Sequence, residues 1–215
     1  MAATPVNTGV TPVVGISDLV LFRVTKDTRT ELTTDDENYI DMRDKVVSRA
    51  YAPENSEGKF YASNTAAVVQ SANKGGGLTL VISDLSPAER EAILASHKTA
   101  GGVTVAGGDD VPPEYIAAYR IKKAKGVYEL HKYAKVVFST PSESAQTENE
   151  SFNAQTTELI GKIAPLNYEV AFADGVKAGN AFFFAVDSTN EKYTALEAEW
   201  FAKGTAGIIP AAPSA

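Results

Sequence analysis

Short apolar runs rich in β-branched residues recur along the chain and predict strands. They lie at 13–24, 45–52, 59–62, 77–83, 114–123, 127–139, 155–166 and 180–187. Polar or glycine-containing stretches bound each run, as is typical of β-strands. Because the runs follow one another without a helix between each pair, the pattern favours antiparallel pairing over a parallel α/β sheet.

Turn signals join several of these runs. Ala124-Lys125-Gly126 has the length and the glycine of a tight hairpin between 114–123 and 127–139. We also expect turns at 53–55 and 73–76, where proline, asparagine and glycine interrupt the apolar pattern.

Two helices are predicted. The first begins near Ser86, which can cap it, with Pro87 in the first turn and Glu89 three residues after the cap. The second covers 193–201 and is amphipathic. The expected core-facing side chains are Leu85, Ile93 and Leu94 in the first helix and Tyr193, Leu196 and Trp200 in the second. The predicted fold class is α+β and β-dominated: an antiparallel sandwich or barrel with one or two flanking helices.

Polar segments divide the chain. Residues 27–44 hold seven acids and two bases, which predicts a long exposed loop or hairpin, and 141–153 is a second acidic loop. Residues 1–12 are rich in Thr, Pro, Ala and Gly and indicate an arm that orders against a partner. We therefore expect an arm at 1–12, one domain at 13–203 and a flexible tail at 204–215.

Composition narrows the function. With 20 basic and 27 acidic residues the chain has a net charge of −7, which disfavours tight nucleic-acid binding. The absence of cysteine excludes disulfides, zinc-thiolate sites and cysteine nucleophiles. The chain shows neither a signal-peptide pattern nor an apolar run of the ~20 residues that a membrane helix needs, so we expect no membrane association and synthesis and assembly in the cytoplasm.

The sequence shows no recognisable catalytic pattern. His97 and His131 are the only histidines, and neither has a second histidine or a carboxylate at ligand spacing. The glycine clusters lack phosphate-binding motifs, the acidic pairs lack the spacing of a calcium loop, and no nucleophile motif occurs. We expect a protein without enzymatic activity, cofactor or metal.

One charge feature suggests an interaction surface. The hairpin from Arg120 to Lys135 holds six bases and one acid, Glu129, and is net +5, whereas 27–44 is net −5. This hairpin is either an ordinary solvated strand face or a docking surface for the acidic segment of a neighbouring copy. The candidate residues for contacts between copies are Asp35, Asp36, Glu37, Arg120, Lys122, Lys123 and Lys125.

Five short segments, in this order, carry a family resemblance. They are 14–20 (VGISDLV), 59–62 (KFYA), 80–85 (LVISDL), 109–113 (DDVPP) and 152–161 (FNAQTTELIG). Together they resemble the major tail proteins, or tail-tube proteins, of siphophages that infect Gram-positive bacteria, over roughly residues 14–205. The acidic segment 27–44 and the Ala/Pro-rich C-terminus depart from that family.

The resemblance implies a β-sandwich-like tail-tube fold with long inter-subunit loops. It implies hexameric rings that stack into the hollow tail of the virion, a conduit for genome ejection. Expected partners are other copies, the tape-measure protein and viral DNA in the lumen, and the tail terminator and distal tail proteins. Glu158, the one acid in the apolar and threonine-rich strand 155–166, is the lumen candidate, with a salt bridge to a neighbouring lysine as its alternative role. The alternative function is a decoration or receptor-binding β-sandwich module of the virion.

Overall fold

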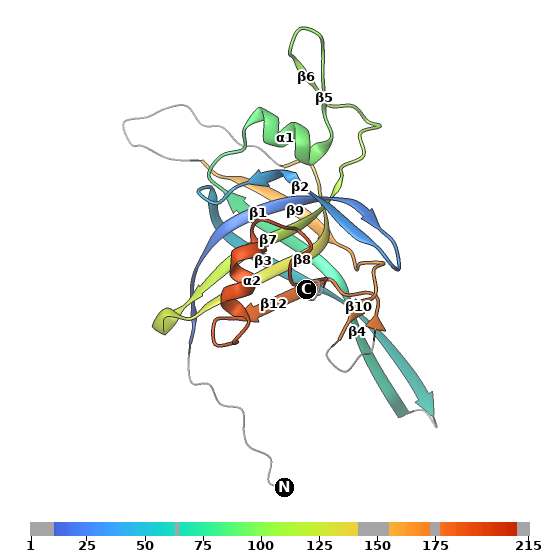
Figure 1. Cartoon of the computed structure of the whole chain (residues 1–215). Coiled ribbons are helices and arrows are strands. Elements are labelled where there is room, and N and C mark those ends of the chain that lie inside the picture. Colours follow the sequence, from blue (N-terminus) through green and yellow to red (C-terminus); the bar gives the residue numbers. More distant parts are fainter. Residues whose placement is uncertain (1–10, 63–64, 142–154, 173–176, 210–215) are drawn as a thin grey trace.

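The computed structural model describes residues 11–62, 65–141, 155–172 and 177–209 (Figure 1). The strands are β1 (Val13–Asp27), β2 (Leu32–Asp41), β3 (Val46–Ala62), β4 (Thr65–Ile82), β5 (His97–Lys98), β6 (Thr104–Val105), β7 (Glu114–Lys123), β8 (Tyr128–Phe138), β9 (Thr157–Ile163), β10 (Val170–Ala171), β11 (Lys177–Ala178) and β12 (Phe183–Asp187). The helices are α1 (Pro87–Leu94) and α2 (Tyr193–Trp200), and a 3₁₀ turn covers Ala124–Gly126.

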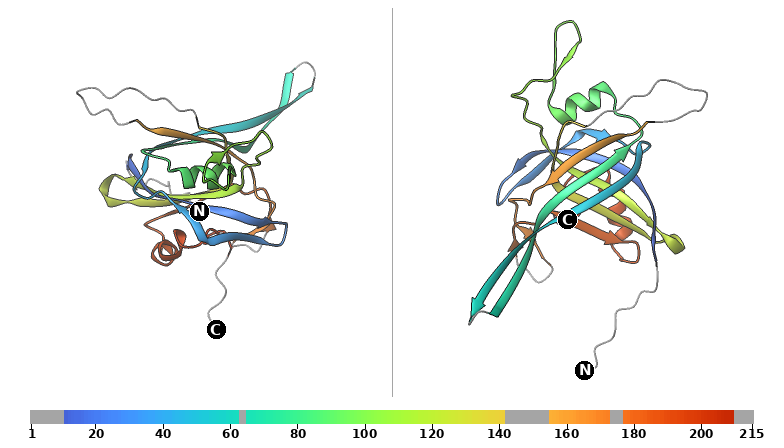
Figure 2. Two further views of the ribbon diagram at one scale, coloured as in Figure 1. Left: turned by 90° about the horizontal axis from the view of Figure 1, so that it is seen from above. Right: turned by 180° about the vertical axis from the view of Figure 1, so that it is seen from behind.

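Eight strands form one antiparallel sheet in the order β2-β1-β7-β8-β9-β4-β3, with β12 also paired to β8. One edge of β8 pairs with two strands, first with β12 along Glu129–Tyr133 and then with β9 along Val136–Phe138. The sheet curls strongly, so that β3 returns close to β1 without forming a ladder with it (Figures 1 and 2). The structure thus confirms the predicted β-dominated α+β class.

Each face of the central strands has its own hydrophobic core. Leu19, Leu80 and Tyr119 belong to the cluster inside the curl, whereas Phe22 and Trp200 belong to a second cluster on the opposite face. The second cluster lies under α2, β12 and the C-terminal segment (Figure 1). Since both faces are covered, Tyr115–Tyr119 is buried at every position, which explains why the apolar pattern there does not alternate.

The helix signals are confirmed. The Ser86 hydroxyl accepts a hydrogen bond from the Glu89 backbone N–H, and the Glu89 carboxylate accepts one from the Ser86 backbone N–H, so α1 begins with a full capping box. Leu85, Ile93 and Leu94 are buried. In α2, Tyr193 and Trp200 are buried and Leu196 packs on the same cluster.

The β7–β8 hairpin is confirmed as well. Its tight turn is left-handed at two residues, Lys125 with φ of 62° and Gly126 with φ of 73°. Glycine accepts that conformation without a Cβ penalty, which is why its place in the sequence was informative.

Two predicted turns are wrong. The strands β3 and β4 run without a break through 53–55 and 73–76, and Pro53 is the register partner of Gly76. A proline is tolerated there because β3 is an edge strand whose far side pairs with no described strand. Position 76 requires glycine, because a Cβ there would lie 2.1 Å from the Ala52 carbonyl oxygen.

The acidic segment 27–44 is not a loop but forms the turn and the second strand of a hairpin with β1. Leu32–Asp41 forms β2 and pairs with β1, with irregularities between Leu21 and Arg23 and between Val24 and Lys26. Its side chains Leu32 and Ile40 are buried, and these two apolar positions anchor an otherwise polar strand.

Packing continues beyond residue 203, where we expected a flexible tail. Ala206 and Ile208 are buried, and Ile208 belongs to the outer cluster. The predicted arm (1–12) and the predicted loop (141–153) lie almost entirely outside the described residues.

Candidate functional site

Arg120, a predicted docking residue, has partners within its own chain. Its Nε lies 3.1 Å from Asp18 Oδ2, and one of its terminal nitrogens lies 2.8 Å from Glu197 Oε1. Its guanidinium also lies over the rings of Tyr128 and Phe201. Arg120 therefore ties β7 to α2.

Other bases of the hairpin are paired in the same way. Lys123 forms an ion pair with Glu129, and Lys135 Nζ lies 3.1 Å from Asp27 Oδ2. Lys132 is fully buried. Lys122 and Lys125 are exposed and have no ion-pair partner in the described part of the chain.

Two of the three acidic candidates also accept hydrogen bonds within the chain, and the third is exposed. Asp35 accepts hydrogen bonds from the Asn38 backbone and side chain, and these bonds lower the pKa of Asp35. Asp36 Oδ1 accepts from the Gly204 N–H at 2.8 Å and from the Thr34 hydroxyl at 2.7 Å. Glu37 is exposed. Of the predicted docking residues, only Glu37, Lys122 and Lys125 are therefore exposed and without a partner in the described part of the chain. They remain the candidates for an electrostatic contact between copies.

Glu158 lies on the outward face of β9. Along this strand Leu159, Gly161 and Ile163 are buried, whereas Glu158, Ile160 and Lys162 are exposed. The ion pairs of the described residues do not include Glu158, so its alternative role in a salt bridge finds no support there. Lys162 lies 3.7 Å from Glu54.

This outward surface continues across three strands and is called the uncovered face below. Its residues are in register as three rows, Ser48–Val81–Glu158, Ala50–Thr79–Ile160 and Ala52–Gly77–Lys162. All nine are exposed or half-buried, because α2 and the C-terminal segment cover other strands. The rows place an acid at one end of the face, a base at the other end, and small or apolar side chains between them.

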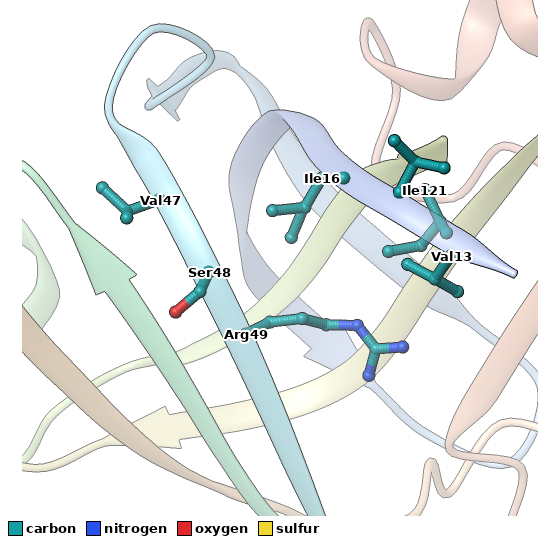
Figure 3. Close-up of a pocket in the computed structure, with 8 residues that line it drawn as sticks. Val13, Ile16, Val47, Ser48, Arg49 and Ile121 are labelled. Carbon is teal, nitrogen blue, oxygen red and sulfur yellow. The ribbon is translucent and has the colours of Figure 1, made fainter. Parts of the chain in front are cut away.

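The uncovered face borders an open strand edge. The strand β3 pairs only with β4, and the part of β1 from Val13 to Ser17 pairs only with β7 among the described residues. Between these two edges lies a groove of about 420 Å³ (Figure 3). Its lining residues are Val13, Val14, Gly15, Ile16, Val47, Ser48, Arg49 and Ile121.

Both histidines have carboxylate neighbours, contrary to the expectation from the sequence; Glu129 lies two residues before His131 on the same face of β8, a spacing that could have shown this pair. His97 Nε2 lies 3.7 Å from Asp110 Oδ1, and His131 Nε2 lies 3.1 Å from Glu129 Oε2. Burial lowers the pKa of His131 in spite of the Glu129 contact. Among the described residues no group of three or more His, Asp or Glu side chains could hold a metal ion, and no helix is long and apolar enough to cross a membrane.

No family model and no curated protein matches the chain. Among solved structures the chain is similar to one titled "Structure of a type six secretion system protein", with a TM-score of 0.27 and 10% sequence identity. The match covers 80% of this chain and 96% of that one. At this TM-score the similarity carries no argument about function.

Proposed function

We propose that the protein is structural: the major tail-tube subunit of a siphophage, which assembles into stacked hexameric rings around a conduit for genome ejection. The observation that carries the proposal is the uncovered face with its open edge. A long unpaired strand edge is a hazard that proteins cover, and a neighbouring copy would cover it, whereas the uncovered face would stay open as the wall of a channel. The family resemblance of residues 14–205 supports the same assignment.

The sheet geometry suits a ring. Its two outermost strands are β2 and β3, so the part of β3 beyond Arg49 in one copy can meet the opposite end of the sheet in the next copy. Such a contact is heterologous, and repeated by rotation it closes into a ring. The β3–β4 hairpin extends well beyond the rest of the curled sheet (Figure 2) and would reach an adjacent ring.

The uncovered face suits a lumen. A wall rich in lysine or arginine would bind phosphates and trap DNA during ejection. On this face the one lysine, Lys162, lies near Glu54, and Glu158 adds an acidic group, so a sliding duplex meets mostly small neutral side chains. In this proposal Glu158 faces the lumen, the tape-measure protein and viral DNA occupy it, and the tail terminator and distal tail proteins close the ends.

A decoration or receptor-binding module remains the second candidate. The β5–β6 hairpin and the segment after it project from the barrel with exposed Val103, Val105 and Val111 (Figure 1). An apolar tip of this kind suits a binding surface for another virion protein.

Electron microscopy of the purified protein, together with light scattering over a range of protein concentrations, separates the two candidates. Rings or tubes with a central channel are expected for the tail-tube subunit. A particle that stays monomeric at every concentration, and instead binds a capsid or a glycan, would reject the tube and support the module. Neither candidate requires a catalytic group.

A further inference from the structure

The groove between β1 and β3 combines two features that an added strand would satisfy. Its walls are strand edges without a partner in the described residues. Its rim carries exposed valines: Val13, Val14 and Val47 are 62%, 64% and 54% exposed. Addition of a strand pairs free main-chain groups and covers apolar side chains at the same time.

The lining favours an occupant without charged side chains. Arg49 is the only charged member of the lining, and its guanidinium lies 5.3 Å from the centroid of the Tyr119 ring. Figure 3 shows the Arg49 side chain crossing the space below β1. A charged side chain buried against the valines and isoleucines, away from Arg49, would lose hydration without compensation.

One segment of the chain outside the described residues fits this groove. Residues 1–10 (MAATPVNTGV) have no charged side chain and join the fold at Thr11, beside the groove residue Val13. By contrast, residues 142–154 carry three glutamates, and residues 210–215 have two prolines in six positions, whereas residues 1–10 have only Pro5; a proline cannot donate to a strand ladder.

The path of the chain favours the arm of another copy. The Pro12 carbonyl accepts a hydrogen bond from the Ala124 N–H at 2.9 Å, which holds the chain at the turn end of β7 as it enters β1. To fill its own groove, the chain would have to reverse sharply before Thr11. An arm from a neighbour needs no reversal, and six extended residues span about 20 Å, the length of an ordinary strand.

We infer that this groove receives residues 1–10 of a second copy as an added β-strand. The inference rests on the proposed self-assembly and names one of its contacts. Each copy then donates one arm and accepts another, which is again a heterologous contact that a ring can close.

Disulfide trapping tests the inference on the full-length protein, because the natural chain contains no cysteine. The single variants Val6→Cys and Val47→Cys, carrying tags of different size, are mixed and oxidised, and a mixed dimer is expected. The matched control is Val6→Cys with Val105→Cys, because Val105 is a comparably exposed valine (46%) on β6. The mixed dimer should form at least ten times faster with Val47→Cys than with Val105→Cys.

Equal rates for the two pairs would overturn the inference. So would the double variant Val6→Cys/Val47→Cys if it closes its disulfide within one chain at low protein concentration, because the groove would then hold the chain's own arm. Microscopy separates this inference from the proposed function. Rings without the cross-link reject the added strand alone, whereas cross-linked copies without rings reject the tube and leave the strand in place.

Discussion

Lys132 Nζ donates a hydrogen bond to the Gly204 carbonyl oxygen at 3.0 Å in the buried layer beneath α2. The same ammonium reaches the carbonyls of Lys203 and Ala206 at 2.8 and 2.9 Å and lies 4.5 Å from the Trp200 ring centroid. On the other side of this turn, Asp36 accepts from the Gly204 N–H. Two charged side chains from distant strands thus hold the C-terminal segment on the sheet.

Replacing Lys132 by methionine should destabilise the protein. Below pH 7, where Lys132 is an ammonium with three N–H donors, three buried carbonyls would lose their donor, which we expect to lower the free energy of unfolding by about 2 kcal/mol or more. Urea unfolding followed by the fluorescence of Trp200, the single tryptophan, measures this change. The control Lys203→Met removes an exposed ammonium and should change stability by less than about 0.5 kcal/mol. Equal effects of the two variants would contradict the role assigned to Lys132.

Stability should also depend on pH through Lys132. Burial lowers the pKa of Lys132 from 10.5 to about 7, and the nearby Asp36 carboxylate partly opposes this shift. Between pH 7 and 10.5 the unfolded chain therefore binds a proton that the folded chain does not, so this contribution to stability rises with pH. It is fully present above pH 10.5 and is lost as the pH falls to 7.

The measurement is the difference in unfolding free energy between the natural protein and Lys132→Met at pH 7, 8 and 9. It should increase with pH by at most about 1.4 kcal/mol per unit. A difference that stays constant or shrinks over this range would show that the ammonium remains charged in the folded protein.

Replacement by alanine should destabilise the protein at Gly161 on β9 but hardly at Gly77 on the adjacent strand β4. At Gly161 a Cβ would meet Val136 Cγ1 at 2.5 Å and the Phe138 ring at 3.0 Å, so Gly161→Ala should cost about 1–3 kcal/mol by overpacking the inner core. Gly77 has no atom within 4 Å of the same position, and Gly77→Ala should be nearly neutral. Thermal unfolding of both variants tests the comparison, and equal melting temperatures would refute it.

Charge reversal should affect assembly only at the exposed end of the hairpin. Lys122→Glu should slow ring formation at low salt, and the defect should shrink at high salt, where exposed charges are screened. Lys192→Glu makes the same charge change at an exposed position just before α2 and should assemble at the natural rate. Light scattering during assembly measures both rates, and identical rates would exclude Lys122 from the contact.

Local signals in the sequence predicted the elements that depend on local chemistry. The capping box at Ser86 and the left-handed turn at Gly126 need only residues within a few positions, so both were visible in the sequence. The β2 strand was ambiguous, because its acids conceal the apolar anchors Leu32 and Ile40. The β3–β4 hairpin was divided wrongly, because the edge position of β3 tolerates Pro53 and the close approach of the Ala52 carbonyl requires Gly76, and neither is visible in the local sequence.

The candidate site was less predictable, since it depends on contacts between distant segments. Lys132 counts as a surface charge in any strand pattern, yet a turn more than 70 residues later buries it. Arg120 likewise has its partners on α2 and at Asp18, where the register between β1 and β7 shifts. The apparent charge of the hairpin was therefore much larger than the charge it presents to another molecule.

The division of β8 between two neighbours has a consequence for local unfolding. Because β12 pairs with β8 along Glu129–Tyr133 while β9 holds Val136–Phe138, the layer of β12, α2 and the C-terminal turn can detach and leave the inner core closed. Amide protons of that layer would then exchange in a sub-global opening, ahead of those in β4 and β7. The chain would then unfold as two cooperative units, and the strand β8 would belong to both.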